Sequence, residues 1–340
     1  MRLLTKYFGT LLWKATTFSL FSLAVILAAV PETVLAGDKP SASNLQQYLE
    51  QVGYAGIALS AREKNKMLVE GKIRDRSCLF LVDTGCSMTT LDTRAARDLK
   101  TLGELGVVVE DRLRGRITNP SVVLVDKLSL GRAQFMNQPA DVQALEMDYI
   151  SAGQEGILGL DFCARNFVLI DCRLHRLYVR GSKPTEQQAR AIEESLRQSG
   201  FVSVPISEGS VAHVEVQINN KPVRLVVDTG AHYTLLDEPL VSRLGLSFAT
   251  HEKVGSLIPE ETSTLIIGIG KIGAHKTKVA TLKTFEVGGR QWKNTAVGVC
   301  DMKAWGDSAL RADGFMGMDI LAGHGALIDL ASWRLWFAPK

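Results

Sequence analysis

The sequence has 340 residues, of which 46% are hydrophobic and 22% charged, and its formal net charge is +3. A chain of this length and composition can bury the core of two domains or of one domain with two lobes, which excludes an extended disordered protein. The small net charge gives no indication of a nucleic-acid partner, and we expect none.

The first 36 residues have the features of an export signal. Basic residues precede a hydrophobic run at 16–30, Pro31 closes the run, and small residues end the segment at Ala36. The run is short for a membrane span. We therefore expect a signal peptide at 1–36, cleavage near Ala36 and an exported protein, periplasmic or secreted. An uncleaved N-terminal membrane anchor is the alternative.

The rest of the chain is predicted to be mainly β, with few helices. Alternating hydrophobic residues at 212–218 are typical of a strand, and pairs such as Asn219-Asn220 and Gly288-Gly289 are typical of tight turns. A weak helical pattern starts at Ser43, and the clearest helix is predicted over 185–200, where Pro precedes it and Gly ends it.

Two long segments of the first half recur in the second half. The residues VEGKIRDRSCLFLVDTG at 69–85 match VEVQINNKPVRLVVDTG at 214–230 without gaps, and 155–179 matches 313–337 in register. A repeat of roughly 140 residues is far longer than a solenoid or propeller unit, so it indicates a duplicated lobe.

The repeat predicts the domain boundaries. We expect a first lobe at 37–181, a linker helix at 182–200 and a second lobe at 201–340.

Each copy contains a hydrophobic strand that ends in Asp-Thr-Gly, with the acids at Asp83 and Asp228. One such segment is common as an ordinary turn. Two copies in duplicated lobes would face each other across a pseudo-two-fold axis. Two carboxyl groups so near to each other cannot readily both be ionised. The ionised one would act as general base on a water molecule, and the protonated one would polarise a substrate carbonyl.

The paired motifs resemble those of aspartic peptidases of the pepsin and retropepsin superfamily, and more closely those of bacterial aspartyl proteases with retropepsin-like domains, here in tandem. In that family a hydrophobic-hydrophobic-Gly motif follows each Asp-Thr-Gly, and here it ends at Gly159 and Gly317, which lie 76 and 89 residues after the acids. The resemblance implies a two-lobed acid protease fold made of two retropepsin-like β-barrel lobes. It also implies an endopeptidase that needs no cofactor.

The resemblance also implies roles for particular residues. Asp83 and Asp228 would be catalytic, and the residues supporting them would be Thr84, Gly85, Thr229, Gly230, Gly159 and Gly317. A mobile flap over the substrate would have its tip at Gly268, Gly270 and Gly273. The first-lobe counterpart, from Asp111, has one central glycine, and a charged hairpin in solvent is its simplest interpretation.

Other chemistry has weaker support in the sequence. The five cysteines are odd in number, so at least one is not in an internal disulfide, and neither cysteines nor histidines have the spacing of a metal site. We expect no metal. Cys86 follows the first motif, and a small space-filling residue is a simpler interpretation than a nucleophile. Asp161 and Asp319 recur after the glycines, and we interpret them as helix N-caps.

Two alternatives to a single-chain peptidase remain open. The chain could bind peptides without cleaving them, because a fold does not determine a function. Each half could instead pair with its twin in a homodimer, so that the site is intermolecular. A metal-dependent hydrolase is a poor third. In the first two cases the expected partner is a peptide or protein.

Overall fold

The computed structural model of the protein describes residues 45–60, 65–104, 108–111, 115–118, 121–143, 153–248, 264–265, 275–276, 278–302 and 312–339. The predicted leader at 1–36 and the predicted flap glycines Gly268, Gly270 and Gly273 lie outside these residues. Both remain predictions.

The first half of the chain forms a seven-stranded sheet that closes on itself. The strand order is β2-β3-β10-β4-β9-β8-β5, and β2 pairs also with β8. The strands are β2 (Leu68–Ile73), β3 (Arg76–Val82), β4 (Thr90–Asp92), β5 (Lys100–Glu104), β8 (Ser121–Leu130), β9 (Ala133–Gln143) and β10 (Gly156–Leu158). A separate hairpin pairs β6 (Val108–Asp111) with β7 (Gly115–Thr118).

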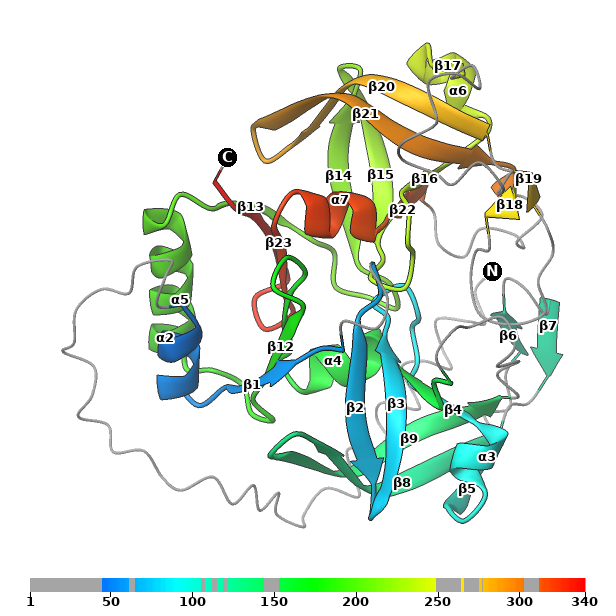
Figure 1. The fold of residues 1–340 in the computed structure, drawn as a ribbon, viewed down its shortest axis with the longest axis vertical. Helices are drawn as coiled ribbons and strands as arrows, with labels where there is room; N and C mark the ends of the chain where they lie inside the picture. Colours follow the sequence, from blue (N-terminus) through cyan, green and yellow to red (C-terminus); the bar gives the residue numbers. More distant parts are fainter. Residues whose placement is uncertain are drawn as a thin grey trace, which may run out of the picture. The chain divides into compact units, whose positions relative to one another are not determined.

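The second half repeats this arrangement strand for strand. Its order is β14-β15-β22-β16-β21-β20-β17, closed by the pairing of β14 with β20. The strands are β14 (His213–Ile218), β15 (Lys221–Val227), β16 (Leu235–Asp237), β17 (Ser247–Phe248), β20 (Lys278–Val287), β21 (Arg290–Cys300) and β22 (Gly314–Met316), and the small pair is β18 (Thr264–Leu265) with β19 (His275–Lys276). Figure 1 shows the two closed sheets, one coloured blue to green and the other yellow-green to red. The predicted two-lobed, mainly β fold is confirmed.

A third sheet joins the two halves. Its order is β1-β12-β11-β23-β24-β13, and β11 pairs antiparallel with β23 at the point where the halves meet. Each half contributes three strands, namely β1 (Ala55–Ala58), β11 (Leu169–Asp171) and β12 (Arg176–Val179) from the first, and β13 (Val202–Pro205), β23 (Ala326–Asp329) and β24 (Arg334–Phe337) from the second. The two lobes are therefore tied together by continuous backbone hydrogen bonds.

Two helices pack against this joining sheet. Helix α5 (Glu186–Gln198) begins at a capping box, in which Thr185 and Gln188 each hydrogen-bond the other's backbone amide. Helix α2 (Leu45–Gln51) lies beside it, and both contribute to a cluster with Tyr178 and Trp336. The other helices are short: α3 (Thr93–Ala96), α4 (Leu160–Arg165), α6 (Leu240–Leu244) and α7 (Met318–Gly323).

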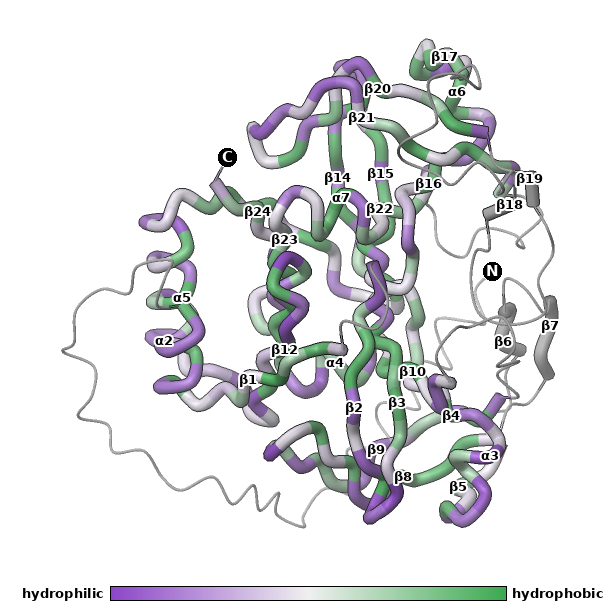
Figure 2. The backbone as a smooth tube through the Cα atoms, in the orientation of Figure 1, coloured by the Kyte–Doolittle hydropathy of each residue, from purple (hydrophilic) through white to green (hydrophobic). Residues whose placement is uncertain are grey.

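Alternation and turn chemistry explain the strands. Figure 2 shows hydrophobic residues interrupted by hydrophilic ones along the paired strands β2, β3, β14 and β15, and most of their apolar side chains are buried in the core. Asn219 and Asn220 have φ of 50° and 61°, and Gly288 and Gly289 have φ of 60° and 77°. Two successive positive φ angles define the tight hairpin turn that matches strand twist, so both predicted turns are confirmed.

Two further properties concern the whole described chain. No helix among the described residues is long and apolar enough to cross a membrane. All five cysteines are free thiols, and only Cys86 is partly exposed.

Candidate active site

The strands β3 and β15 bring the two Asp-Thr-Gly segments together at the centre of the fold (Figure 1). The amide of Asp83 donates to the carbonyl of Leu158 at 3.0 Å, and that of Asp228 donates to the carbonyl of Met316 at 3.0 Å. The acids therefore continue β3 and β15 beside their parallel neighbours β10 and β22. The structure thus places both acids at equivalent strand ends.

Backbone amides hold each carboxyl group in the same way. Asp83 Oδ1 accepts from the amides of Gly85 and Cys86 at 2.9 and 3.1 Å. Asp228 Oδ1 accepts from the amides of Gly230 and Ala231 at the same two distances. The exposed fractions of the two residues are 8% and 9%. In each acid one oxygen is fixed by the turn, which orients the carboxyl group.

The two threonines interlock the lobes by four buried hydrogen bonds. Thr84 Oγ1 donates to the carbonyl of Val227 at 2.7 Å and accepts from the amide of Thr229 at 3.1 Å. Thr229 Oγ1 donates to the carbonyl of Val82 at 2.8 Å and accepts from the amide of Thr84 at 3.1 Å. Both side chains are fully buried. This reciprocal network fixes one Asp turn relative to the other.

Gly85 and Gly230 leave space for the opposite carboxyl group. A Cβ atom on Gly85 would lie 2.4 Å from Cγ of Asp228, and one on Gly230 would lie 2.4 Å from Cγ of Asp83. Gly85 also donates its amide to Asp83. One glycine therefore touches both carboxyl groups, and any side chain there would displace one of them.

Gly159 and Gly317 support the turns from behind. A Cβ on Gly159 would lie 2.5 Å from the backbone of Met88, and one on Gly317 would lie 2.5 Å from the backbone of Tyr233. Strand β10 lies between β3 and β4, parallel to the first and antiparallel to the second, and β22 lies likewise between β15 and β16. The glycines thus let each Asp loop pass across the strand that supports it.

The structure corrects the interpretation of Asp161 and Asp319 as N-caps. The N-caps of α4 and α7 are Gly159 and Gly317, which have no capping side chain. Asp161 Oδ1 instead accepts from Thr89 Oγ1 at 2.8 Å.

Asp319 binds its loop in the same way. Its Oδ1 accepts from both the amide and Oγ1 of Thr234 at 2.8 Å. Thr234 Oγ1 in turn accepts from the amide of Gly317 at 3.0 Å. Burial raises the pKa of Asp319 to about 6, against these hydrogen bonds, which lower it.

Sequence reasoning missed the threonines that these acids bind. Thr89 and Thr234 each follow the Asp of their Asp-Thr-Gly motif by the same interval, so their recurrence was the available signal.

Cys86 does not have the properties of a nucleophile. Its Sγ donates to the carbonyl of Met88 at 3.1 Å. Burial, together with the charge of Asp83, raises the pKa of the thiol well above its ordinary value. The reactive thiolate is therefore scarce at neutral pH.

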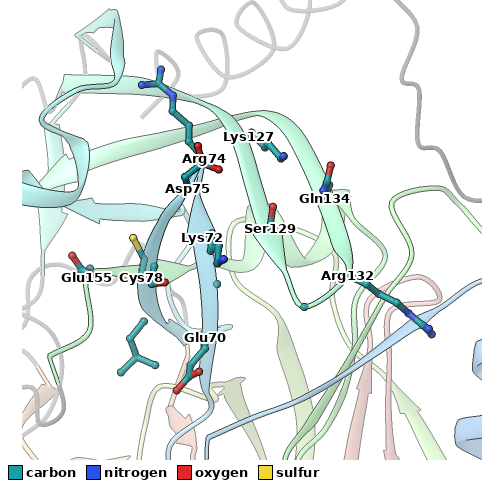
Figure 3. Close-up of a pocket in the computed structure, with 14 residues that line it drawn as sticks. Glu70, Lys72, Arg74, Asp75, Cys78, Lys127, Ser129, Arg132, Gln134 and Glu155 are labelled. Carbon is teal, nitrogen blue, oxygen red and sulfur yellow. The ribbon is translucent and has the colours of Figure 1, made fainter.

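The described residues show no metal-ligand cluster, and one charged surface depression lies away from the two Asp-Thr-Gly turns. Among the described residues, no group of three or more His, Cys, Asp or Glu side chains could hold a metal ion. An open depression of about 690 Å³ lies instead on β2, β3 and β8 of the first lobe. Its charged lining, shown in Figure 3, includes Glu70, Lys72, Arg74, Lys127, Arg132 and Glu155. Neither Asp83 nor Asp228 belongs to it.

Comparison with known proteins identifies the family. The chain is similar to the crystal structure of aspartic proteinase from Irpex lacteus, with 14% identity, a TM-score of 0.49 and coverage of 85% of this chain and 98% of that one. It is also similar to a retropepsin-like aspartic protease from Rickettsia conorii, with 21% identity, a TM-score of 0.28 and coverage of 41% and 92%. No curated protein sequence matches the chain.

The model of the family described as aspartyl protease matches twice, at residues 69–162 and 214–320. Because the two matches span more than half of the sequence, one in each lobe, the chain belongs to the aspartyl protease family.

Proposed function

We propose that this protein is an aspartic endopeptidase whose single active site combines Asp83 and Asp228 of one chain. The observation that carries the proposal is that each carboxyl group lies against the glycine of the other motif. A Cβ atom added to either glycine would lie 2.4 Å from the Cγ atom of the opposite Asp. Membership of the aspartyl protease family gives independent support.

The chemistry follows from two carboxyl groups held together. Two such groups do not readily ionise at once, so one proton is shared between them; acid proteases are the standard example of this effect. The ionised carboxyl takes a proton from water as the water attacks the peptide carbonyl, and the protonated carboxyl donates to the carbonyl oxygen. The amides of Gly85 and Gly230 keep each carboxyl in position throughout. The hydrated carbonyl then breaks its C–N bond as the carboxyl that took the proton from water gives it to the leaving amine, and the other carboxyl takes back its proton. No bond forms between enzyme and substrate.

The experiment that tests this proposal is hydrolysis of a mixed peptide library, followed by mass spectrometry. We expect the wild-type protein to cleave and Asp83→Asn to abolish cleavage, because the amide can neither act as the base nor share the proton. Peptide binding without turnover by the wild-type protein would favour the non-catalytic alternative instead.

A homodimer with intermolecular sites is the second alternative. The hydrogen bonds of Thr84 and Thr229 join the two motifs within one chain, which supports an intramolecular site. We therefore expect specific activity to stay constant on dilution, whereas an intermolecular site would lose activity as the dimer dissociates.

We also propose that the protein is exported and cleaved near Ala36. The proposal rests on the hydrophobic segment and its small-residue end in the sequence. N-terminal sequencing of the protein from separated cell fractions tests it: a start near Gly37 outside the cytoplasm is expected, and an intact N-terminus in the membrane fraction would favour the anchor.

A further inference from the structure

One face of each lobe's sheet carries the Asp of its motif. In β3, Phe80 and Val82 point into the main core, whereas Leu79 and Leu81 belong to a separate small cluster that also contacts Cys86. Because side chains alternate along a strand, Asp83 lies on the face of Leu81. By the same alternation Asp228 lies on the face of Val226 in β15, whose neighbours point into the core.

On this face of the first lobe, a row of side chains runs from strand to strand, starting at Leu81, two residues before Asp83. In register, Leu81 of β3 is beside Ile157 of β10, Ile157 is beside Thr90 of β4, and Thr90 is beside Asp141 of β9. Leu91 and Ala140, the chain neighbours of Thr90 and Asp141, point into the core on the other face. The row therefore runs from the catalytic strand to a buried acid.

The second lobe has the same row with different chemistry. Val226 is beside Phe315, Phe315 is beside Leu235, and Leu235 is beside Gly298. Phe315 and Leu235 belong to an apolar cluster that includes Tyr233. Where the first lobe has Thr and Asp, the second thus has Leu and Gly.

Asp141 is buried with one oxygen unused. Its exposed fraction is 1%. Its Oδ2 accepts from Nε2 of Gln143 at 2.7 Å, and its Oδ1 accepts no hydrogen bond of good geometry from the described residues. Burial raises the pKa of this carboxyl, and the neighbouring side chains of Thr90 and Gln143 lower it. Its amide donates to the carbonyl of Thr89 at 2.9 Å, so the strand is fixed next to the loop of the first motif. A buried carboxylate oxygen without a donor is costly, and supplying a donor recovers that cost.

We propose that Asp141 selects a basic substrate side chain, Lys or Arg, on the first-lobe side of the active site, while the matching position of the second lobe takes an apolar side chain. The inference rests on the proposed function and specifies its substrate class. Charge also links Asp141 to the site: burial raises the pKa of the Cys86 thiol most, and the charges of Asp83 and Asp141 raise it further. A cation brought to Oδ1 gains a charge-assisted hydrogen bond, whereas an apolar side chain leaves the carboxylate unpaired.

The test compares two peptides that differ only by Lys or norleucine at the selected position, which a position-scanned library first identifies. Loss of one charge-assisted hydrogen bond corresponds to about 10- to 100-fold in kcat/KM. We expect the wild-type protein to prefer Lys by this factor and Asp141→Asn to lose the preference. Thr90→Leu with Asp141→Gly copies the second-lobe row and should reverse it.

Asp126→Asn is the matched control, because it removes one charge from the same lobe at a half-exposed residue paired with Arg74. It should keep the Lys preference. A wild-type protein with no preference for a basic side chain, or an unchanged preference in Asp141→Asn, would overturn the inference.

A binding measurement separates this inference from the proposed function. If the wild-type protein cleaves no peptide, the proposed function fails, and fluorescence polarisation of the same labelled pair decides the inference. Tighter binding of the Lys peptide that Asp141→Asn abolishes would support it, and equal binding of the two peptides would overturn it.

Discussion

The interlocked threonines should contribute a large share of the stability of the protein. Thr84→Val keeps the shape of the side chain but removes two buried hydrogen bonds, the 2.7 Å bond to the Val227 carbonyl and the 3.1 Å bond from the Thr229 amide. Each of the two buried groups left without a partner costs about 1–3 kcal/mol, so the expected loss is roughly 2–6 kcal/mol. Against a total of about 5–15 kcal/mol, this is a large fraction.

Urea denaturation followed by tryptophan fluorescence measures the loss. With an m value of about 2–3 kcal/mol/M, the Thr84→Val midpoint should fall by roughly 1–3 M, and activity should fall with it because the two Asp turns lose their common anchor. Thr84→Ser is the control: it keeps the hydroxyl and removes only a methyl group, which costs about 0.8 kcal/mol. Equal midpoints and equal activities for the Val and Ser variants would refute the reasoning.

Three further predictions concern the turns and their supports. Gly85→Ala should lower the hydrolysis rate at least about 100-fold, because its Cβ would lie 2.4 Å from Cγ of Asp228. The control Gly209→Ala should match wild type, because the nearest atom to its Cβ would be 3.7 Å away. Because burial raises the pKa of Asp319 from 3.8 to about 6, the folded protein binds the extra proton between those values and its stability falls as pH rises. Asp319→Asn keeps an acceptor oxygen and should remove this fall, at most about 3 kcal/mol, in urea titrations at acid and neutral pH; an identical slope in both proteins would contradict it. Because burial raises the pKa of the Cys86 thiol, iodoacetamide at neutral pH should leave the native protein unmodified there, and rapid alkylation seen by mass spectrometry would be the opposite result.

The sequence was enough to predict the fold because the gene duplication is still visible in it. The two copies of Asp-Thr-Gly and the glycines Gly159 and Gly317 recur in register, and that recurrence required equivalent places in two similar lobes. Turn pairs such as Asn219-Asn220 were predictable for a local reason, since few residues other than Asn and Gly accept two positive φ angles.

What the sequence could not show depends on neighbours across the sheet. Asp161 follows Gly159 and so resembled a local N-cap, but its partner is Thr89, on a different loop. The sequence did not single out Asp141, because its proposed role depends on two facts of strand register. It lies beside Thr90, and it occupies the position that Gly298 has in the other lobe. Such contacts follow from strand register, which hydrophobic alternation does not determine between distant strands.

The central claim is that one carboxyl from each lobe forms a single site, and the residual activities of Asp83→Asn and Asp228→Asn, measured side by side, test it most directly. We predict that each substitution alone lowers kcat/KM at least about 1000-fold, because neither carboxyl can carry out both proton transfers. If each variant instead kept about half of the wild-type activity, as expected when each motif pairs with its twin from a second chain, the claim would be contradicted.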